Sequence, residues 1–472
     1  MPEYDAVVVG SGPNGLAAAI ELARNDLDVA VVEAKATIGG GMRTAELTLP
    51  GFRHDICAAV LPTAAASPYF STLPLDEHGL EWVHPDLPVA QPLADGDAAA
   101  VFADLDETAD HFGEDGRAYR KMVKPFVRNS QALIDGVLNP VLGVPRSPVV
   151  MARFGALGAR SAAGLASRFE GERARATVAG AAAHSITSLD AAFTAALPIV
   201  FSTLAHTSGW PFARGGSQAL ADALASYFVS LGGKIHTDTT VDDLDELDAR
   251  AVLLNVAPGG VASILGDRIG GGFAQRLQDW KHGPGVFKVD WALDGPIPWT
   301  NELVHRAGTV HVGGSFEAVA AGEAEVMAGG HPERPFVLLA QPSHWDTTRA
   351  PDGKHTVWAY CHVPNGSNVD MTDRIETHIE EYAPGFRDLI IGRHTMNCAA
   401  IEAHNPNYVG GDIGGGAFTP MQVISRSAHR GNPYATPLDN VFVCSSSTPP
   451  GAGVHGMAGY NAARVVVDRM FS

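Results

Sequence analysis

The first 44 residues carry the pattern that most constrains the fold. An apolar, largely β-branched run of strand length, Tyr4–Val9, leads directly into the glycine-rich turn GSGPNG at residues 10–15. An Ala- and Leu-rich helical pattern follows to about residue 25, and a second apolar run, Val29–Val32, ends on Glu33. A strand, a glycine turn, a helix, a strand and an acid in this order predict the βαβ unit that binds a dinucleotide.

Each residue of this unit has an expected role. Gly10 makes the tight turn, Gly12 lets the backbone approach a pyrophosphate, and Gly15 lets helix and strand pack closely. The N-terminus of the helix faces the phosphate charge. Glu33 lies where an acid hydrogen-bonds a ribose hydroxyl. The other predicted contacts of this unit are Ser11, Pro13, Asn14 and Ala34.

A second glycine stretch follows the second strand and narrows the choice of dinucleotide. Residues 36–44 read ATIGGGMRT. This stretch resembles the second flavin motif of amine oxidases and carotenoid desaturases, in which the loop lies against the pyrophosphate and ribityl chain of FAD. The resemblance implies that Gly40, Gly41, Met42, Arg43 and Thr44 contact FAD. Gly41 departs from the pattern, because an arginine is frequent at that position.

The resemblance extends nearly from end to end. Residues 51–68 (GFRHDICAAVLPTAAASP) and 451–464 (GAGVHGMAGYNAAR) are similar to phytoene desaturase-like oxidoreductases, most nearly to the branch called pyridine nucleotide-disulphide oxidoreductase domain-containing protein 2. It implies FAD as the cofactor and places a helix N-terminus at the flavin ring, where it stabilises negative charge by roughly 0.3–2 kcal/mol. The implied contacts there are Gly453, Val454, His455, Gly456 and Met457. Ser445 stands where glycine is frequent.

A segment in the middle of the chain, residues 217–241, is expected to belong to the nucleotide-binding domain. Ser217 is expected to cap a helix from Gln218 to Leu231, which Gly232 closes before a short strand. By resemblance, the backbone of Val241 contacts the adenine. The family has a longer β-hairpin after this point, so we expect a short hairpin here.

The predicted fold class is α/β, with a Rossmann-like FAD-binding domain and an inserted mixed sheet-plus-helix substrate domain. The FAD domain is predicted to be discontinuous, over 1–70, 206–270 and 395–472. The substrate domain takes 71–205 and 271–394, with strands over 285–292, 335–341 and 355–363. Within it, 107–136 is expected to form an amphipathic helix kinked at Pro125, and 138–205 small closely packed helices.

Composition excludes several function classes. A net charge of −19 argues against nucleic acid as a partner. The four cysteines form no C-x-x-C pair, and no second dinucleotide motif is present, so neither a disulphide reductase nor an NAD(P)H site is expected. The histidines lack metal-ligand spacing, and no metal is expected. The uncharged stretch 191–213 favours a buried or substrate-lining segment over a membrane span, because it holds two prolines, a histidine and several hydroxyl residues.

Two residues are the catalytic candidates. Lys288 lies in GVFKVDWALDGPIPW, which resembles the amine oxidase strand whose lysine holds a water against the reactive flavin nitrogen. The alternative is an ordinary strand lysine. His455 lies in the turn expected at the flavin and either touches the ring or supports it from behind. His54 and Asp55 are expected to be structural.

Four hypotheses for function stay open. The first is an FAD-dependent dehydrogenase or desaturase of an apolar, isoprenoid- or carotenoid-like substrate, re-oxidised by oxygen or a quinone. The others are an amine oxidase-type enzyme, a reduced-flavin isomerase, and a non-enzymatic escort protein of the same fold. The first expected strand begins within a few residues of the N-terminus, so no targeting peptide is expected, and the expected location is cytoplasmic, with peripheral membrane contact left open. The oligomeric state is not predicted.

Overall fold

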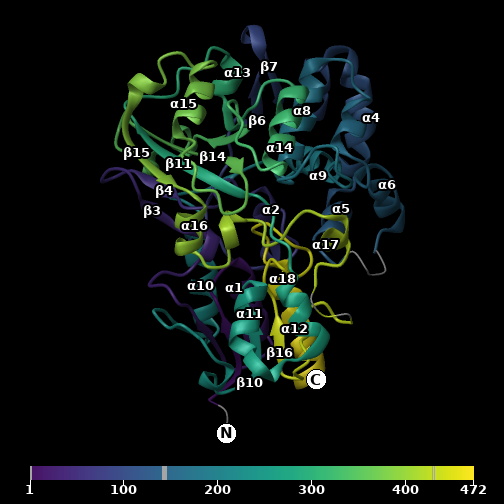
Figure 1. The fold of residues 1–472 in the computed structure, drawn as a ribbon, viewed down its shortest axis with the longest axis vertical. Coiled ribbons are helices and arrows are strands. Elements are labelled where there is room, and N and C mark those ends of the chain that lie inside the picture. Colours follow the sequence, from purple (N-terminus) through teal and green to yellow (C-terminus); the bar gives the residue numbers. More distant parts are fainter. Residues whose placement is uncertain (1–2, 141–145, 428, 430) are drawn as a thin grey trace.

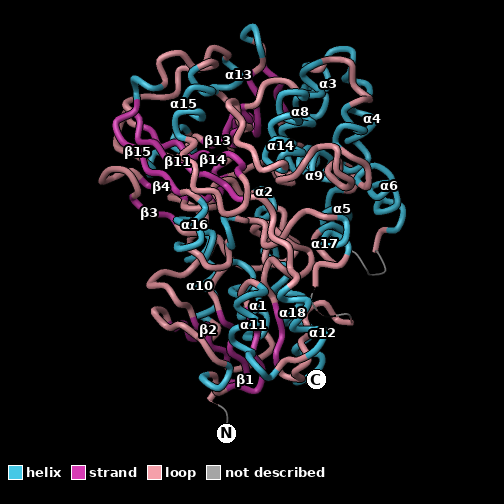
Figure 2. Tube along the Cα trace, in the orientation of Figure 1, coloured by secondary structure: helices cyan, strands magenta, loops and turns pink. Residues whose placement is uncertain are grey.

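The computed structural model describes residues 3–140, 146–427, 429 and 431–472. A five-stranded sheet lies at the end of the molecule that holds both termini, and a seven-stranded sheet lies at the other end beside a group of helices (Figure 1). Loops lie between the two sheets (Figure 2), and the sequence colours of Figure 1 show that many of them belong to the C-terminal third of the chain.

The five-stranded sheet has the order β16-β10-β1-β2-β9, and all its pairs are parallel. Its strands are β1 (Tyr4–Val9), β2 (Val29–Val32), β9 (Lys234–His236), β10 (Ala249–Leu254) and β16 (Val441–Val443). The chain therefore builds outward from β1 in one direction and then returns to build in the other. This is the doubly wound order, and it places a crevice at the carboxyl ends of β1 and β10, where the direction changes.

Helices cover both faces of this sheet, because alternate strand residues point to opposite sides. On one face Ala6 and Val8 pack with α1 (Pro13–Ala23), α10 (Gln218–Ser230) and α18 (Met457–Val466). On the other face Val7 and Val9 pack with α11 (Pro258–Leu265) and α12 (Gly271–Gln278). Most positions of β1, β2, β10 and β16 are thus buried, which explains their apolar runs, whereas the edge strand β9 is largely exposed.

The seven-stranded sheet has the order β15-β11-β14-β13-β12-β6-β7. Its strands are β6 (Leu87–Pro92), β7 (Ala98–Val101), β11 (Gly285–Leu293), β12 (Ala307–Val312), β13 (Val337–Ala340), β14 (His355–Val363) and β15 (Ile390–Met396). All pairs are antiparallel except β12 with β6. The predicted strands over 285–292, 335–341 and 355–363 are confirmed as neighbours or near neighbours in it.

A group of helices, which we call the cap, packs beside this sheet (Figure 1). It consists of α3 (Leu105–His111), α4 (Gly116–Val127), α5 (Ser130–Val137), α6 (Pro148–Gly158), α7 (Ala162–Ala166), α8 (Glu172–Ala183) and α9 (Ala196–Ala205). The prediction of one helix over 107–136 kinked at Pro125 is wrong. Pro125 lies inside α4, and the chain is instead interrupted around 112–115 and at 128–129. Part of 138–205, residues 141–145, lies outside the described residues.

Two local predictions around α10 and β10 are also wrong. Ser217 does not cap α10 with its side chain, because its hydroxyl donates to the carbonyl oxygen of Ala58. In place of a short hairpin before β10, a 3-10 turn over Leu244–Glu246 carries a capping box from Asp243. The carboxylate of Asp243 accepts from the backbone N–H groups of this turn, so these groups are hydrogen-bonded without a partner strand.

The remaining elements connect these layers. They are the pairs β3 (Thr44–Glu46) with β4 (Arg53–Asp55) and β5 (Trp82–Val83) with β8 (Phe212–Ala213), and the helices α2 (Pro62–Ala65), α13 (Glu302–His305), α14 (Phe316–Met327), α15 (Thr372–Glu380), α16 (Cys398–His404) and α17 (Pro420–Ile424). Within the described ranges, every helix is too short or too polar to cross a bilayer.

Candidate functional site

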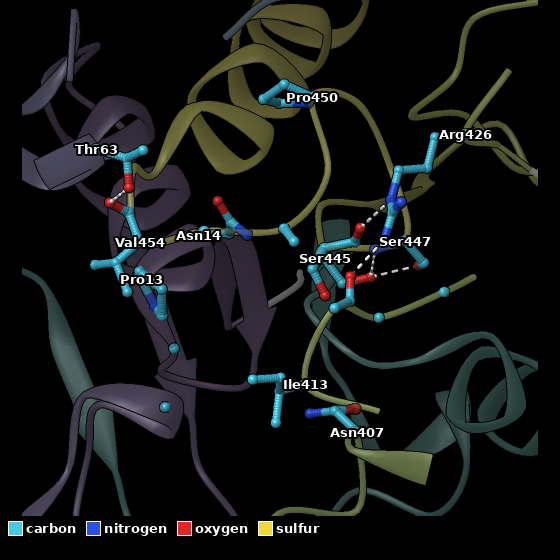
Figure 3. A pocket seen from close by; sticks show the side chains of 18 of the residues that line it. Pro13, Asn14, Thr63, Asn407, Ile413, Arg426, Ser445, Ser447, Pro450 and Val454 are labelled. Carbon is cyan, nitrogen blue, oxygen red and sulfur yellow. Dashed lines mark hydrogen bonds between the residues drawn. The ribbon is translucent and has the colours of Figure 1, made fainter. Parts of the chain in front are cut away.

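A cavity of about 1580 Å³ begins at the carboxyl ends of the parallel strands and continues between the seven-stranded sheet and the cap. Loops from distant parts of the chain line this cavity. In the close view of Figure 3, Pro13 and Val454 lie on one side and Arg426 and Ser447 on the other. Typical small-molecule pockets are about 300–1,000 Å³. The cavity therefore has room for more than one ligand of ordinary size.

The first glycine turn forms one end of this cavity, and its backbone requires glycine. Gly10 has a φ of +96°, in the left-handed region. A Cβ on Gly15 would overlap the carbonyl oxygen of Gly10, so α1 could not begin so close to β1 with any other residue. The amide of Asn255, which directly follows β10, donates to the same carbonyl oxygen at 3.1 Å. The turn is thus fixed from both strands of the crevice.

Glu33 joins the two glycine loops. Its Oε2 accepts from the backbone N–H of Ser11 at 3.0 Å and from the Ser11 hydroxyl at 2.6 Å. Its Oε1 accepts from the Arg43 guanidinium and from the backbone N–H of Lys35, both at 3.0 Å. A carboxylate has about four acceptor positions. All of those of Glu33 are used within the protein, so a bound ribose would share or displace one of these donors.

The second glycine loop presses against the first. A Cβ on Gly40 would lie 3.0 Å from the Cα of Gly12. A Cβ on Gly41, the position where the family frequently has arginine, would overlap the hydroxyl of Tyr408. Tyr408 follows α16 and lines the cavity. The departure at Gly41 therefore has a physical reason: a tyrosine from a distant segment occupies the space of the usual side chain.

At the C-terminal segment, His455 is buried behind the cavity wall. Its Nδ1 accepts from the backbone N–H of Met457 at 3.1 Å, and its carbonyl oxygen accepts from Ser67 at 2.6 Å. Burial lowers the pKa of His455 to about 4. The neutral ring thus serves as an acceptor for the first turn of α18. Of the two roles left open by the sequence, this hydrogen bond is the supporting one, because the His455 ring does not line the cavity.

The predicted site residues divide into two sets. Those that line the cavity are Gly10, Gly12, Pro13, Asn14, Glu33, Ala34, Gly40, Gly41, Arg43, Val241, Gly453 and Val454. Those outside its lining are Ser11, Gly15, Met42, Thr44, Lys288, His455, Gly456 and Met457. The second set supports the first: Met42 is fully buried, and Thr44 donates to Asp55 at 2.7 Å.

Lys288 lies in a buried charge cluster and not at the cavity surface. Its ammonium pairs with Asp290 two residues along β11, and both side chains are buried. His54 lies 3.6 Å from the same carboxylate. Burial opposes ionisation of Asp290, but Lys288 and the neighbouring histidines outweigh it and hold its pKa below the usual value. Burial also lowers the pKa of His54 to about 4.

The far end of the cavity is lined largely by apolar and aromatic side chains from the cap and the large sheet, and the cap adds the charged residues Asp135 and Arg146. The apolar and aromatic residues are Phe193, Leu197, Val200, Phe201, Trp210, Leu338, Trp358 and Tyr360. His184 is the histidine among them, and its Nε2 lies 3.1 Å from Nε2 of His311. Burial lowers the pKa of His184 to about 3, which keeps the ring neutral. This end therefore suits an uncharged, apolar molecule.

Sequence reasoning missed several cavity residues. Asn255 could have been found, because it directly follows a strand of the parallel sheet, where ligands bind. His404, Asn407, Tyr408 and Arg426 had no such signal, since they lie on loops and short helices. Burial lowers the pKa of Arg426 to about 10, and its Nε donates to the carbonyl oxygen of Ser446 at 2.7 Å.

Among the described residues, no group of three or more His, Cys, Asp or Glu side chains could hold a metal ion. The four cysteines are free thiols.

The fold and the cavity define the class. Residues 8–73 match the family model for an NAD(P)-binding Rossmann-like domain. The chain is similar in sequence to carotenoid desaturases, and it shares the fold of solved amine oxidases. The solved cyclohexylamine oxidase from Brevibacterium oxydans has the same fold, with a TM-score of 0.64 and 17% identity over 100% of both chains.

Among the proteins of known sequence, the chain is similar to phytoene desaturase-like oxidoreductases. It is 28% identical to pyridine nucleotide-disulfide oxidoreductase domain-containing protein 2 of Mus musculus, over 98% of this chain and 93% of that protein. It is also 25% identical to a lycopene-forming phytoene desaturase of Pseudescherichia vulneris, over 52% of this chain and 53% of the other. The resemblance inferred from the sequence motifs is confirmed.

Proposed function

We propose that this protein is an FAD-dependent dehydrogenase or desaturase that takes hydride from a C–H bond of an apolar substrate. The observation that carries the proposal is the single continuous cavity. One end has two glycine loops in contact with each other and the N-terminus of α1, which has no side-chain cap. The other end is lined largely by apolar and aromatic side chains. A cofactor at the first end and a substrate at the second would meet inside one cavity.

The glycine-loop end fits a dinucleotide. The first turn of α1 has no side-chain cap, so its N–H groups face the cavity without an internal partner. Asn14, in the same turn, has a buried side-chain oxygen without a hydrogen-bond partner. Gly10, Gly12 and Gly40 leave no side chain between the backbone and a pyrophosphate. FAD fits better than a nicotinamide dinucleotide because the C-terminal segment, Gly453 and Val454, closes the same cavity.

FAD, when bound, supplies the hydride acceptor. The chain's own part is to bind, orient and exclude water. Glu33 holds both glycine loops in place, and the α18 N-terminus, held by His455, supports the turn at Gly453. Trp358 and Tyr360, with ring centroids 5.2 Å apart, give the far end a rigid apolar wall.

The apolar and aromatic lining of the far end favours an apolar substrate over an amine. An ammonium group beside these side chains would meet neutral His184 and aromatic rings, and the charged lining residues of the cap, Asp135 and Arg146, carry opposite charges. Re-oxidation by oxygen or a quinone completes the proposed cycle, and the protein needs no NAD(P)H.

The test is to purify the protein, record the flavin absorption spectrum, and titrate it without oxygen. Polyenes of isoprenoid type should bleach the bound flavin, whereas primary amines should leave it oxidised. Bleaching by amines with release of hydrogen peroxide would establish an amine oxidase instead. A colourless protein that does not take up added FAD would contradict the proposal and favour an escort protein.

A further inference from the structure

The apolar end of the cavity contains polar groups that the protein itself leaves without a partner. Tyr360 on β14 lines the cavity and is 7% exposed, and its hydroxyl makes no hydrogen bond with any described residue. Thr309 on β12 also lines the cavity, and its Oγ1 is buried without a hydrogen-bond partner. The same is true of Nε1 of Trp358, two residues before Tyr360. The wall is therefore not purely apolar.

These three groups share one face of the seven-stranded sheet. Trp358 and Thr309 lie opposite the same residue of β13, Ala340, from the two strands that flank it. Tyr360 points to the same side as Trp358, because residues two apart on a strand share a face. Trp358 and Tyr360 belong to the buried apolar cluster that includes residues of α4, α7 and α8. The unpaired groups thus lie on the face that is turned to the cap.

A pure hydrocarbon would leave these groups unpaired. A buried hydroxyl or N–H group without a hydrogen bond costs free energy, and an apolar ligand that displaces water from such a group does not restore the bond. A ligand oxygen does restore it. Burial raises the pKa of Tyr360, so its hydroxyl stays protonated and can donate. The wall is therefore suited to a ligand that is mostly apolar and carries an oxygen as acceptor.

The charges near this wall indicate that the oxygen is neutral. Lys288 and Asp290, on the adjacent strand β11, pair with each other. His184 is a neutral ring, since burial lowers its pKa to about 3. Asp135 and Arg146, which line the cavity from the cap, carry opposite charges. An ionised ligand group would lose its hydration here without an excess of counter-charge, whereas an alcohol or a carbonyl oxygen would not.

We propose that the substrate is an apolar, isoprenoid-like molecule with one neutral oxygen, an alcohol or a ketone, and that Tyr360 donates a hydrogen bond to this oxygen. The inference rests on the proposed function, because it takes the far end of the cavity as the place of the substrate. Tyr360 is then a specificity-determining residue. A site built to hydrogen-bond a substrate oxygen rejects the analogue that lacks it more strongly than an apolar pocket rejects a change of size.

The test compares two compounds of one carbon skeleton, the isoprenoid alcohol farnesol and the hydrocarbon farnesene. Their dissociation constants for the as-purified protein are measured by isothermal titration calorimetry. Tyr360→Phe should weaken farnesol about tenfold and leave farnesene unchanged, because phenylalanine keeps the ring and loses only the donor. Thr309→Val should shift the ratio of the two constants in the same direction, by about two- to threefold. The matched control, Tyr69→Phe, removes a buried hydroxyl outside the cavity lining and should change neither constant.

Four results would overturn the inference. They are no binding of farnesol to the wild type, an unchanged ratio of the two constants in Tyr360→Phe, an equal change in Tyr69→Phe, and tighter binding of the ionised analogue farnesoic acid than of farnesol. Thermal unfolding of each variant separates a lost contact from lost folding. Binding requires no hydride transfer, so the two proposals fail separately. A flavin that no polyene bleaches would contradict the proposed function, whereas an unchanged ratio would contradict the hydrogen bond from Tyr360.

Discussion

The two ends of the cavity are built on different principles. At the glycine-loop end the surface is mainly backbone, and its shape depends on positions where no side chain fits, such as Gly10, Gly15 and Gly40. At the far end the surface is made of side chains, and elements as distant in sequence as α9 and β14 supply it. We therefore expect the first end to tolerate few substitutions and the second to accept changes of side chain without loss of the fold.

The difference agrees with the ligand that we propose for each end. A pyrophosphate needs close backbone N–H groups and a helix N-terminus, and only a few local arrangements provide them. An apolar molecule needs only a dry surface of suitable shape, which many combinations of side chains provide. Substitutions at the first end should therefore cost folding and cofactor together, and those at the second should change only substrate binding.

The largest effect is expected for Gly15→Ala. The new Cβ would overlap the Gly10 carbonyl oxygen, which is backbone and cannot move aside without opening the turn. We expect a loss of about 4 kcal/mol or more in the free energy of unfolding, together with loss of bound flavin. Urea unfolding and the flavin-to-protein absorbance ratio measure both.

Gly155→Ala is the matched control. Gly155 also lies within a helix, α6, but a Cβ there would meet nothing within 4 Å. Alanine should stabilise the helix by about 0.5–1 kcal/mol and leave the flavin content unchanged. Equal destabilisation by the two substitutions would contradict the role assigned to the turn.

The next largest loss of unfolding free energy is expected for Glu33→Ala. It removes the acceptor for Ser11 and leaves the Arg43 guanidinium, which is also buried, without its carboxylate. Breaking a buried ion pair on one side costs about 3 kcal/mol. Glu33→Gln, which keeps an acceptor oxygen, should lose less. If both variants unfold at the wild-type urea concentration, the carboxylate does not join the two loops.

A smaller effect is expected from pH at His455. Its pKa is about 4 in the folded protein and about 6.5 when unfolded, so the unfolded chain binds the proton more tightly. The stability contributed by the neutral ring is present above pH 6.5 and is lost as the pH falls towards 4. Between pH 7 and pH 5 this group should cost about 2 kcal/mol of unfolding free energy.

His455→Asn provides the comparison, because the asparagine oxygen can accept from the Met457 N–H without titrating. Between pH 7 and pH 5, the unfolding free energy of this variant should fall by about 2 kcal/mol less than that of the wild type, because the variant lacks the titrating ring. An identical pH dependence in both proteins would assign the acid sensitivity to other groups, among them His54 and His184.

The smallest effect on the fold is expected at the far end, from Leu197→Trp. Leu197 lines the cavity and is only partly buried, so the larger ring should project into the apolar space. Substrate affinity should fall about tenfold, equivalent to about 1.4 kcal/mol, with flavin content and urea unfolding unchanged. Anaerobic titration of the flavin measures this. Loss of flavin in this variant would mean that the two ends are not independent.

Sequence and structure agree best where the information is local. The strands Tyr4–Val9 and Val29–Val32 and the helix between them were predicted because period and glycine spacing act within a few residues. The predicted cap at Ser217 and the predicted single helix over 107–136 are wrong because contacts between distant segments decide the structure there. The Ser217 hydroxyl is taken by the Ala58 carbonyl, 159 residues away, and packing within the cap decides where its helices end.

By itself the sequence determined the glycine-edged parallel unit and the existence of a second sheet, because each depends on contacts between near neighbours in the chain. Only the tertiary structure decided that the Tyr408 hydroxyl occupies the space beside Gly41, that Lys288 is paired with Asp290 outside the cavity lining, and that His455 accepts from Met457 and does not line the cavity. The physical reason is that these positions result from packing between segments far apart in the sequence, and no local pattern records that packing.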